Sequence, residues 1–131
     1  MARLIVDTSS LIALGRGTAL LSTAISDDDD VAVAAITVAE LLVGVELGET
    51  RYRERRVDWV HGLLAALAVE PYDLDVAREH ASLLAHVKRA GEPRGAHDLI
   101  VAATARARKR TVVTRDERGF AGLPAVDVRT P

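Results

Sequence analysis

The chain contains no cysteine among its 131 residues. This absence excludes a disulfide framework and the thiolate zinc sites, and it is typical of proteins from a reducing compartment. Aromatic residues are also scarce, at 3%, whereas hydrophobic residues reach 49%. The core must therefore be built from Ala, Val, Leu and Ile, and a chain of this length is expected to form one domain over residues 1–131.

The sequence also lacks a long apolar run and an excess of positive charge. No stretch approaches the roughly 18 apolar residues of a membrane helix, and the short run after Arg3 is interrupted by Asp7, unlike a secretory signal. The formal net charge is −2, so the protein has no overall positive field that would attract nucleic acid. We expect a cytoplasmic protein with no membrane contact, in which any contact with nucleic acid is local.

Short apolar runs alternate with sequence of helical character. Parallel strands need long crossover connections and read as continuous apolar runs, so this alternation predicts an α/β fold with a mostly parallel sheet covered on both faces. Strands are expected at 4–6, 31–36, 68–72, 111–113 and 125–128, helices at 19–25, 52–67 and 75–90, and a loop at the acidic run 27–30.

Four acidic residues stand near the ends of these runs. Asp7 ends the first strand, Glu40 lies just beyond the second on the first turn of a helix, and Asp98 begins the helix before the fourth strand. Asp116 follows that fourth strand. The carboxyl ends of parallel strands share one edge with the next helix N-termini, and ligands bind there. We therefore expect these acids to face a common crevice, with Asp7 and Asp98 closest to any ion.

Each acid also has a purely structural explanation. Thr37 with Glu40, and Thr114 with Glu117, fit the spacing of a capping box at a helix start. Asp98 in a first helical turn is stabilised by the helix dipole whatever its function. No single acid therefore identifies a site, and the prediction rests on their occurrence at one edge.

Acids gathered at one edge need compensation. Two like charges about 4 Å apart repel by about 4 kcal/mol at an effective dielectric constant of about 20. Either some carboxyls stay protonated or a divalent cation neutralises them, and oxygen ligands without cysteine favour Mg²⁺ or Mn²⁺. Mg²⁺ typically takes one or two direct carboxylates, so not all four need contact it. His97, beside Asp98, either hydrogen-bonds near this site or merely begins the helix.

Four segments, in order, resemble the acidic motifs of PIN-domain ribonucleases, and most closely those of VapC-type toxins of bacterial toxin–antitoxin pairs. They are "LIVDTSSLIAL", "TVAELLVG", "HDLIVAATA" and "TVVTRDERGF", between about Leu4 and Phe120. The resemblance implies a three-layer α/β/α fold and a Mg²⁺- or Mn²⁺-dependent endoribonuclease that hydrolyses RNA phosphodiester bonds. It also implies a homodimer and inhibition by a small VapB-like antitoxin whose C-terminal segment covers the cleft.

The resemblance extends to individual residues. Thr114 matches the family's polar residue two positions before the last acid, and Ser9 matches the hydroxyl that often follows the first. Gly119 is a departure, because many relatives carry a further acid there. The four acids match the family's quartet. In the mechanism that the resemblance implies, Asp7 and Asp98 hold the principal ion, while Glu40 and Asp116 hold a second ion or orient the water. The hydroxyls of Thr114 and Ser9 support these acids with hydrogen bonds.

Two further groups of residues bear on partners. Two basic clusters are candidates for contact with an RNA backbone, although clusters of this kind are more often solvated helix faces. A helical stripe that includes Trp59 favours core packing or a partner interface. The clusters are Arg51, Arg53, Arg55 and Arg56, and Arg106, Arg108, Lys109 and Arg110.

Alternative functions remain open from the sequence. The Trp59 stripe supports a metal-free protein-interaction module on the same fold. A phosphatase with aspartate after its first strand would need an acid where Ser9 stands. A receiver-like domain would use Asp73 as phosphoacceptor, but "VDVRTP" lacks the lysine that such a domain carries after its fifth strand.

Overall fold

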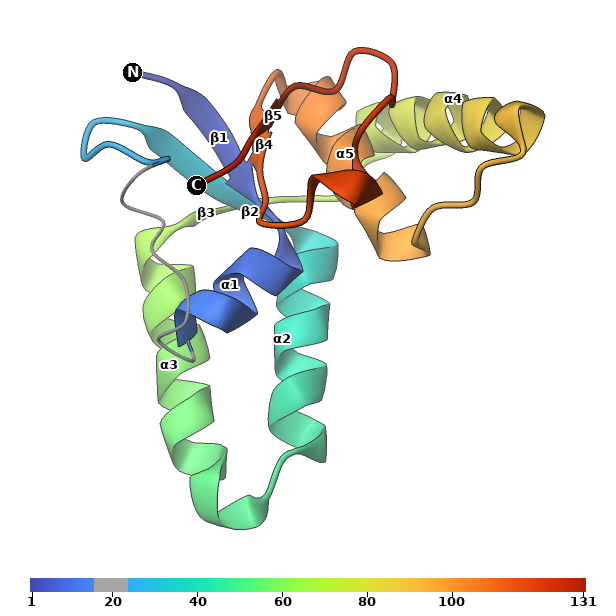
Figure 1. Ribbon diagram of the computed structural model, residues 1–131. Helices are drawn as coiled ribbons and strands as arrows, with labels where there is room; N and C mark the ends of the chain where they lie inside the picture. Colours follow the sequence, from blue (N-terminus) through green and yellow to red (C-terminus); the bar gives the residue numbers. More distant parts are fainter. Residues whose placement is uncertain (16–23) are drawn as a thin grey trace.

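The computed structural model describes residues 1–15 and 24–131. Within these ranges, strands form one fully parallel sheet in the order β3-β2-β1-β4-β5 (Figure 1). The predicted parallel α/β architecture is confirmed. The strands are β1 (Arg3–Val6), β2 (Asp30–Ala34), β3 (Ala68–Glu70), β4 (Thr111–Val113) and β5 (Val128–Arg129).

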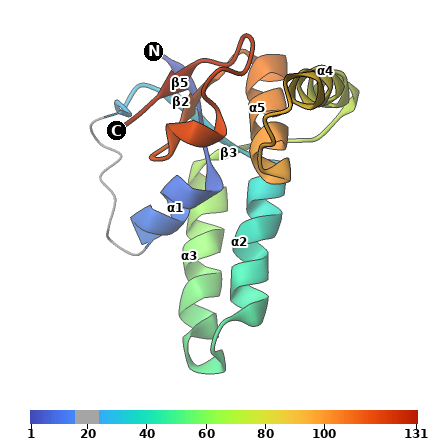
Figure 2. The ribbon, with the colours of Figure 1, turned by 45° about the vertical axis from the view of Figure 1, so that its right-hand side comes forward.

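Helices cover both faces of this sheet. Two of them, α2 and α3, run side by side away from the sheet, and a short 3₁₀ turn, η2, joins them at the far end (Figures 1 and 2). One face carries α1 (Thr8–Gly15), α2 (Ala35–Leu47) and α3 (Arg53–Ala66), with η2 at Thr50–Tyr52; the other carries α4 (Leu74–Ala90) and α5 (Ala96–Arg108), and a second 3₁₀ turn, η3, spans Glu117–Gly119.

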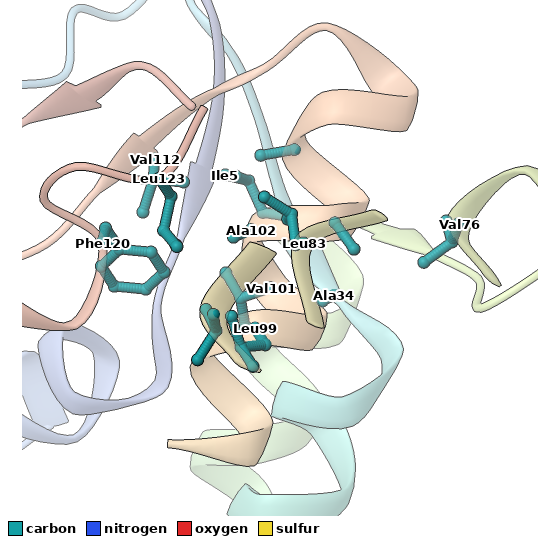
Figure 3. Close-up of a cluster of buried hydrophobic side chains, with 13 residues drawn as sticks. Ile5, Ala34, Val76, Leu83, Leu99, Val101, Ala102, Val112, Phe120 and Leu123 are labelled. Atoms are coloured by element: carbon teal, nitrogen blue, oxygen red, sulfur yellow. The ribbon is translucent and has the colours of Figure 1, made fainter. Parts of the chain in front are cut away.

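The alternation of side chains along β1 divides the core into two clusters. Ile5 packs with side chains of α4 and α5 and with Phe120, as Figure 3 shows. Its neighbours Leu4 and Val6 point the other way and pack with α1, α2 and α3. Successive strand residues face opposite sides of a sheet, so β1 is buried on both faces. These two clusters confirm the three-layer α/β/α fold.

Three predicted strand boundaries are wrong. The run 31–36 ends as a strand at Ala34, and Ala35 already begins α2. The run 68–72 stops before Pro71, which has no backbone N–H for the ladder. Most of the run 125–128 is irregular, because Ala125 has a φ of 55°, a left-handed conformation incompatible with an extended strand.

The two long predicted helices are confirmed with small shifts. The first, predicted at 52–67, is α3, and the second, predicted at 75–90, is α4. Helix α4 begins where Asp73 accepts a hydrogen bond of 3.1 Å from the Val76 amide, and it ends at Gly91, whose φ is 68°.

The predictions before β2 have a mixed outcome. Of the helix predicted at 19–25, residues 19–23 lie outside the described part, while Ala24 is in a turn and Ile25 is irregular. The acidic run forms the expected loop at 27–29, and Asp30 begins β2.

The strand order excludes the receiver-like alternative. Receiver folds have the order 2-1-3-4-5, whereas here β1 lies between β2 and β4. Asp73, which that alternative needed as a phosphoacceptor, follows the edge strand β3, where it caps α4 and pairs with Arg108 at 2.6 Å. This aspartate therefore has a structural role in the protein.

Candidate active site

The strand order reverses between β1 and β4: the chain adds β2 and β3 on one side of β1, and β4 and β5 on the other. In open α/β sheets, ligands bind at the carboxyl edge beside such a switch point. Asp7 follows β1 and Asp116 comes three residues after β4. Glu40 reaches this edge from α2, and Asp98 lies in the first turn of α5. We call this region the acidic edge: Asp7, Glu40, Asp98 and Asp116.

Asp7 is buried, with 4% of its surface exposed, and both of its carboxylate oxygens accept hydrogen bonds. Thr114 Oγ1 and Ser9 Oγ donate to Oδ2 at 2.6 and 3.0 Å. The Ser10 amide donates to Oδ1 at 3.0 Å. Hydrogen bonds that favour the ionised form hold this carboxylate in one orientation. The two hydroxyls singled out from the sequence therefore both contact the first acid of the acidic edge.

Glu40 lies one helical turn later than the sequence predicted. Helix α2 begins at Ala35 and has no side-chain cap, so the capping box of Thr37 and Glu40 is wrong. Thr37 is buried inside the helix start. The Glu40 carboxylate instead accepts a hydrogen bond of 2.8 Å from Thr8 Oγ1 and lies 3.1 Å from His97 Nδ1.

Asp98 is the residue at which the acids interact. Burial raises the pKa of its carboxyl, and the negative charges of Asp7, Glu40 and Asp116 raise that pKa further, while His97 opposes the shift. An acid feels a neighbouring charge in this way only when the two are close. The raised pKa therefore supports the predicted convergence of the acids on one crevice.

Two glycines pack directly against Asp98. A Cβ atom added to Gly119 would lie 2.7 Å from Asp98 Oδ2, and one added to Gly95 would lie 3.2 Å from the same oxygen. The carboxylate thus occupies the space that a side chain at position 119 would need. A side chain at position 119 would therefore displace the Asp98 carboxylate from its observed position.

Asp116 is the most exposed acid of the acidic edge and already has a cationic partner. Its Oδ1 accepts hydrogen bonds from the Arg118 side chain at 3.0 Å and from the Arg118 amide at 3.2 Å, and Arg118 lowers the pKa of Asp116. These contacts make Asp116 the cap of η3. The capping box expected from Thr114 and Glu117 is wrong, since Asp116 caps η3 and the Thr114 hydroxyl oxygen accepts from the Asp116 amide instead.

The acids of the acidic edge offer oxygen ligands to a divalent cation without forming a closed cage. Within residues 1–15 and 24–131, no group of three or more His, Cys, Asp or Glu side chains is close enough to hold a metal. This excludes a preformed three-ligand cage in those ranges. Mg²⁺ keeps several waters and uses one or two carboxylates, so the carboxylate oxygens of Asp7 and Asp98 suit a hard cation.

The two basic clusters differ in their surroundings. The arginines of the second cluster are paired within the chain: Arg106 with Glu79 at 2.8 Å, and Arg108 and Arg110 both with Glu70, at 2.9 and 2.8 Å. They are therefore poor candidates for RNA contact. In the first cluster Arg53 pairs with Glu46. Of the other three, Arg51 lies over the Tyr52 ring, 4.5 Å from its centroid, while Arg55 and Arg56 line a groove.

This groove has a volume of about 510 Å³ and lies between α1, α2 and α3. Trp59 forms part of its wall and packs against the buried cluster on this face of the sheet, as the sequence stripe predicted. Glu40 belongs both to the groove and to the acidic edge. The groove is lined by Ile12, Glu40, Leu41, Gly44, Val45, Tyr52, Arg55, Arg56, Trp59 and Val60.

Two residues of the site region carried no signal in the sequence. Thr8 contacts Glu40 from α1, and Arg94 donates to the carbonyl oxygens of Arg118 and Ala121 at 2.8 and 2.5 Å. Arg94 thus ties the η3 segment to the start of α5. These three hydrogen bonds join residues 24 to 32 positions apart in the chain, so no local sequence pattern reveals them.

Fold and site together define a three-layer α/β/α protein with a carboxylate site at the switch point of a parallel sheet. The model of the PIN domain family matches residues 4–125. The chain belongs to this family.

Similar proteins agree with this assignment. Ribonuclease VapC5 of Mycobacterium tuberculosis is 36% identical over 91% of this chain and 86% of its own length. The VapBC-5 toxin–antitoxin structure of the same organism is 32% identical, with a TM-score of 0.77, over 99% of this chain and 98% of the matched chain. A DNA-bound VapBC structure from Salmonella typhimurium is 26% identical, with a TM-score of 0.85, over 99% of this chain and 98% of the matched chain.

Among the described residues, no helix is long and apolar enough to cross a membrane.

Proposed function

We propose that this protein is a VapC-type endoribonuclease that hydrolyses RNA phosphodiester bonds with Mg²⁺ or Mn²⁺ and acts as the toxin of a toxin–antitoxin pair. The observation that carries the proposal is the placement of Asp7, Glu40, Asp98 and Asp116 at the switch-point edge of the sheet. Consistent with it, burial and the charges of the other three acids raise the pKa of Asp98. In a member of the PIN family, acids that repel one another at the switch point are best explained as a cation site. The relatives named ribonuclease and toxin support the reaction.

Asp7 and Asp98 would hold the principal cation. When bound, the cation would activate a water and offset the charge that develops on the phosphate. Asp7 is oriented for this role by Ser9, Ser10 and Thr114, so little reorganisation is needed. Asp98 keeps its position against Gly119.

Glu40 and Asp116 would hold a second ion or orient the attacking water. The hydrogen bond from Thr8 and the contact with His97 would orient Glu40 to accept a hydrogen bond from water at the edge. Asp116 shares its charge with Arg118, which favours a water-mediated role over direct ligation.

The proposed partners are an RNA substrate, a VapB-like antitoxin and a second copy of the chain. The groove between α1, α2 and α3 suits the antitoxin, because its wall includes Glu40 and an occupant would reach the acidic edge. Arg55 and Arg56 add positive charge to the groove. The proposed functional unit is a single domain over residues 1–131 in the cytoplasm.

Cleavage assays test the nuclease proposal. Purified protein is incubated with a panel of cellular RNAs in Mg²⁺, in Mn²⁺ and in chelator. We expect cleavage only with a divalent ion, and a loss of about 100-fold or more in Asp7→Asn and Asp98→Asn, because each substitution removes a charge at the reacting centre. Asp58→Asn, on the exposed side of α3, is the matched control and should cleave normally. Cleavage that survives in both variants contradicts the proposal.

The metal-free interaction module is the competing function, favoured by the groove around Trp59. Calorimetric titration with Mn²⁺ separates the two. The nuclease should bind the ion through a site that Asp98→Asn removes, whereas an interaction module should show no such site.

A further inference from the structure

Two polar side chains contact the Glu40 carboxylate, one at each oxygen: Thr8 through a hydrogen bond and His97 through an ion-pair contact. Thr8 Oγ1 lies 2.8 Å from Oε1, and His97 Nδ1 lies 3.1 Å from Oε2. Thr8 stands in the first turn of α1, Glu40 in α2 and His97 in the first turn of α5. The carboxylate is therefore fixed by elements on both sides of its own helix.

The two groups are chemically complementary. An ionised carboxylate can only accept, and His97 can present Nδ1 to it either as a protonated ring or as a neutral ring with its hydrogen on Nδ1. Either form requires that Nδ1 lie beside Oε2, as it does here.

Glu40 needs the second donor because of its surroundings. Its side chain is long, 29% exposed, and repelled by the nearby Asp98 charge. A glutamate held only by Thr8 could pivot about one hydrogen bond and populate other rotamers. His97, next to Asp98 on the same helix, opposes that movement from the α5 side.

We propose that His97 is a positioning residue that acts through Glu40, fixing its carboxylate at the acidic edge together with Thr8. The role rests on the proposed nuclease function, in which Glu40 holds a second ion or orients water. Loss of a side chain that orients a ligating or water-positioning carboxylate typically changes metal affinity or activity by about 10- to 100-fold.

Kinetics of His97→Ala and His97→Asn form the first test. We expect His97→Ala to lower kcat by about 10- to 100-fold with KM for RNA unchanged, because the substrate contacts remain. Asparagine can place an amide N–H near the position of Nδ1, so His97→Asn should recover part of kcat. His61→Ala, an exposed histidine on α3, is the control and should match the wild type. A rise in KM without loss of kcat would overturn the role and assign His97 to RNA binding.

A double-mutant cycle with Glu40→Ala tests whether His97 acts through Glu40. Once Glu40 is removed, His97→Ala should cause no further loss, since the two residues serve one function. Independent, additive losses would overturn the inference. Unchanged melting temperatures of the single variants would exclude a general loss of folding.

Nitrogen-15 NMR of the imidazole tests the contact without enzymatic activity. At one fixed pH, the wild type should show hydrogen on Nδ1 of His97, and Glu40→Ala should shift that signal. If the wild type cleaves no RNA, the nuclease proposal fails while this measurement still reports the contact. An Nδ1 signal unaffected by Glu40→Ala would overturn the positioning role whatever the activity.

Discussion

Two charged regions of this protein are treated in opposite ways. Around Arg110, which is 6% exposed, acids and cations balance: the guanidinium lies 2.8 Å from Glu70 and 3.1 Å from Asp30. At the acidic edge, Asp98 is half-buried and faces other negative charges that raise its pKa. Burial of unpaired charge is costly. The acids around Arg110 are neutralised by a cation of the chain itself, whereas those near Asp98 are not, so the acidic edge is where an external cation would be stabilised.

The compensated region is structural. Arg110 also donates to the carbonyl oxygens of Leu4 and Asp30, at 3.2 and 3.0 Å, and so links β1, β2 and β3 through side chain and backbone. Its donors are satisfied within the chain, and none of these contacts reaches the acidic edge. The comparison predicts that changes at Arg110 affect stability, whereas changes at the acidic edge affect activity and metal response.

The largest expected effect is the loss of the buried cation. Arg110→Met should destabilise the fold by about 3 kcal/mol, because the Leu4 and Asp30 carbonyls lose a buried donor and Glu70 keeps only Arg108 as a partner. Urea denaturation measures the change. Arg3→Met is the matched control: Arg3 also pairs with Asp30, at 2.9 Å, but is 45% exposed, so about 0–1 kcal/mol is expected. Equal losses in the two variants would contradict the comparison.

The next effect concerns Gly119. Gly119→Ala places a Cβ where Asp98 Oδ2 lies, so it should displace the carboxylate and reduce cleavage by about 100-fold, the typical consequence of a misplacement near 1 Å. The melting temperature should change little, since η3 is a short surface turn. Gly62→Ala, in α3 with open space around it, is the control and should leave activity intact. Normal cleavage by Gly119→Ala would show that Asp98 tolerates the shift.

A smaller effect is expected in the pH dependence of stability. The folded pKa of Asp98 is raised from its ordinary 3.8, so its contribution is fully present below that value and is lost as pH rises through the folded pKa. In chelator, Asp98→Asn should therefore melt a few degrees above the wild type at pH 7, and the difference should shrink toward pH 4. Mg²⁺ should reverse the order by stabilising only the wild type. A pH-independent difference would argue against the repulsion.

The smallest effect is expected at the exposed pair of Asp116 and Arg118. Arg118 lowers the pKa of Asp116, so Arg118→Ala should move the titration of that carboxyl to higher pH. Carbon-13 NMR of the carboxyl follows the shift. Both groups are exposed to solvent, so the melting temperature at pH 7 should not change. A clear loss of stability would show that this pair is more than a surface contact.

The sequence predicts the sheet well because its signal is local. Buried parallel strands are short apolar runs, and the runs at Leu4 and Thr111 place Asp7 and Asp116 at one edge directly. Prediction fails where the end of a helix or strand depends on a backbone conformation that the residue type does not indicate. Ala35 starts α2 without a capping side chain, which moved Glu40 by one turn, and Ala125 adopts a left-handed conformation that its identity does not suggest.

The supporting contacts of the site are harder to predict because they are not local. His97 was noticed only as a neighbour of Asp98, and its contact with Glu40 depends on the packing of α2 against α5. Thr8 gave no separate signal beside Ser9. Orientation of a side chain across helices follows from the assembled fold, so spacing in the sequence does not reveal it.

The hydrogen bond between Thr114 and Asp7 has a consequence for the timing of assembly. These residues are 107 positions apart, and Arg115 donates to Ser10 across 105 positions. Contacts of such separation form late, after most of the chain is available. A chain of which only the first hundred residues have been synthesised lacks Thr114, Arg115 and Asp116, so the acidic edge can be completed only when synthesis is nearly finished.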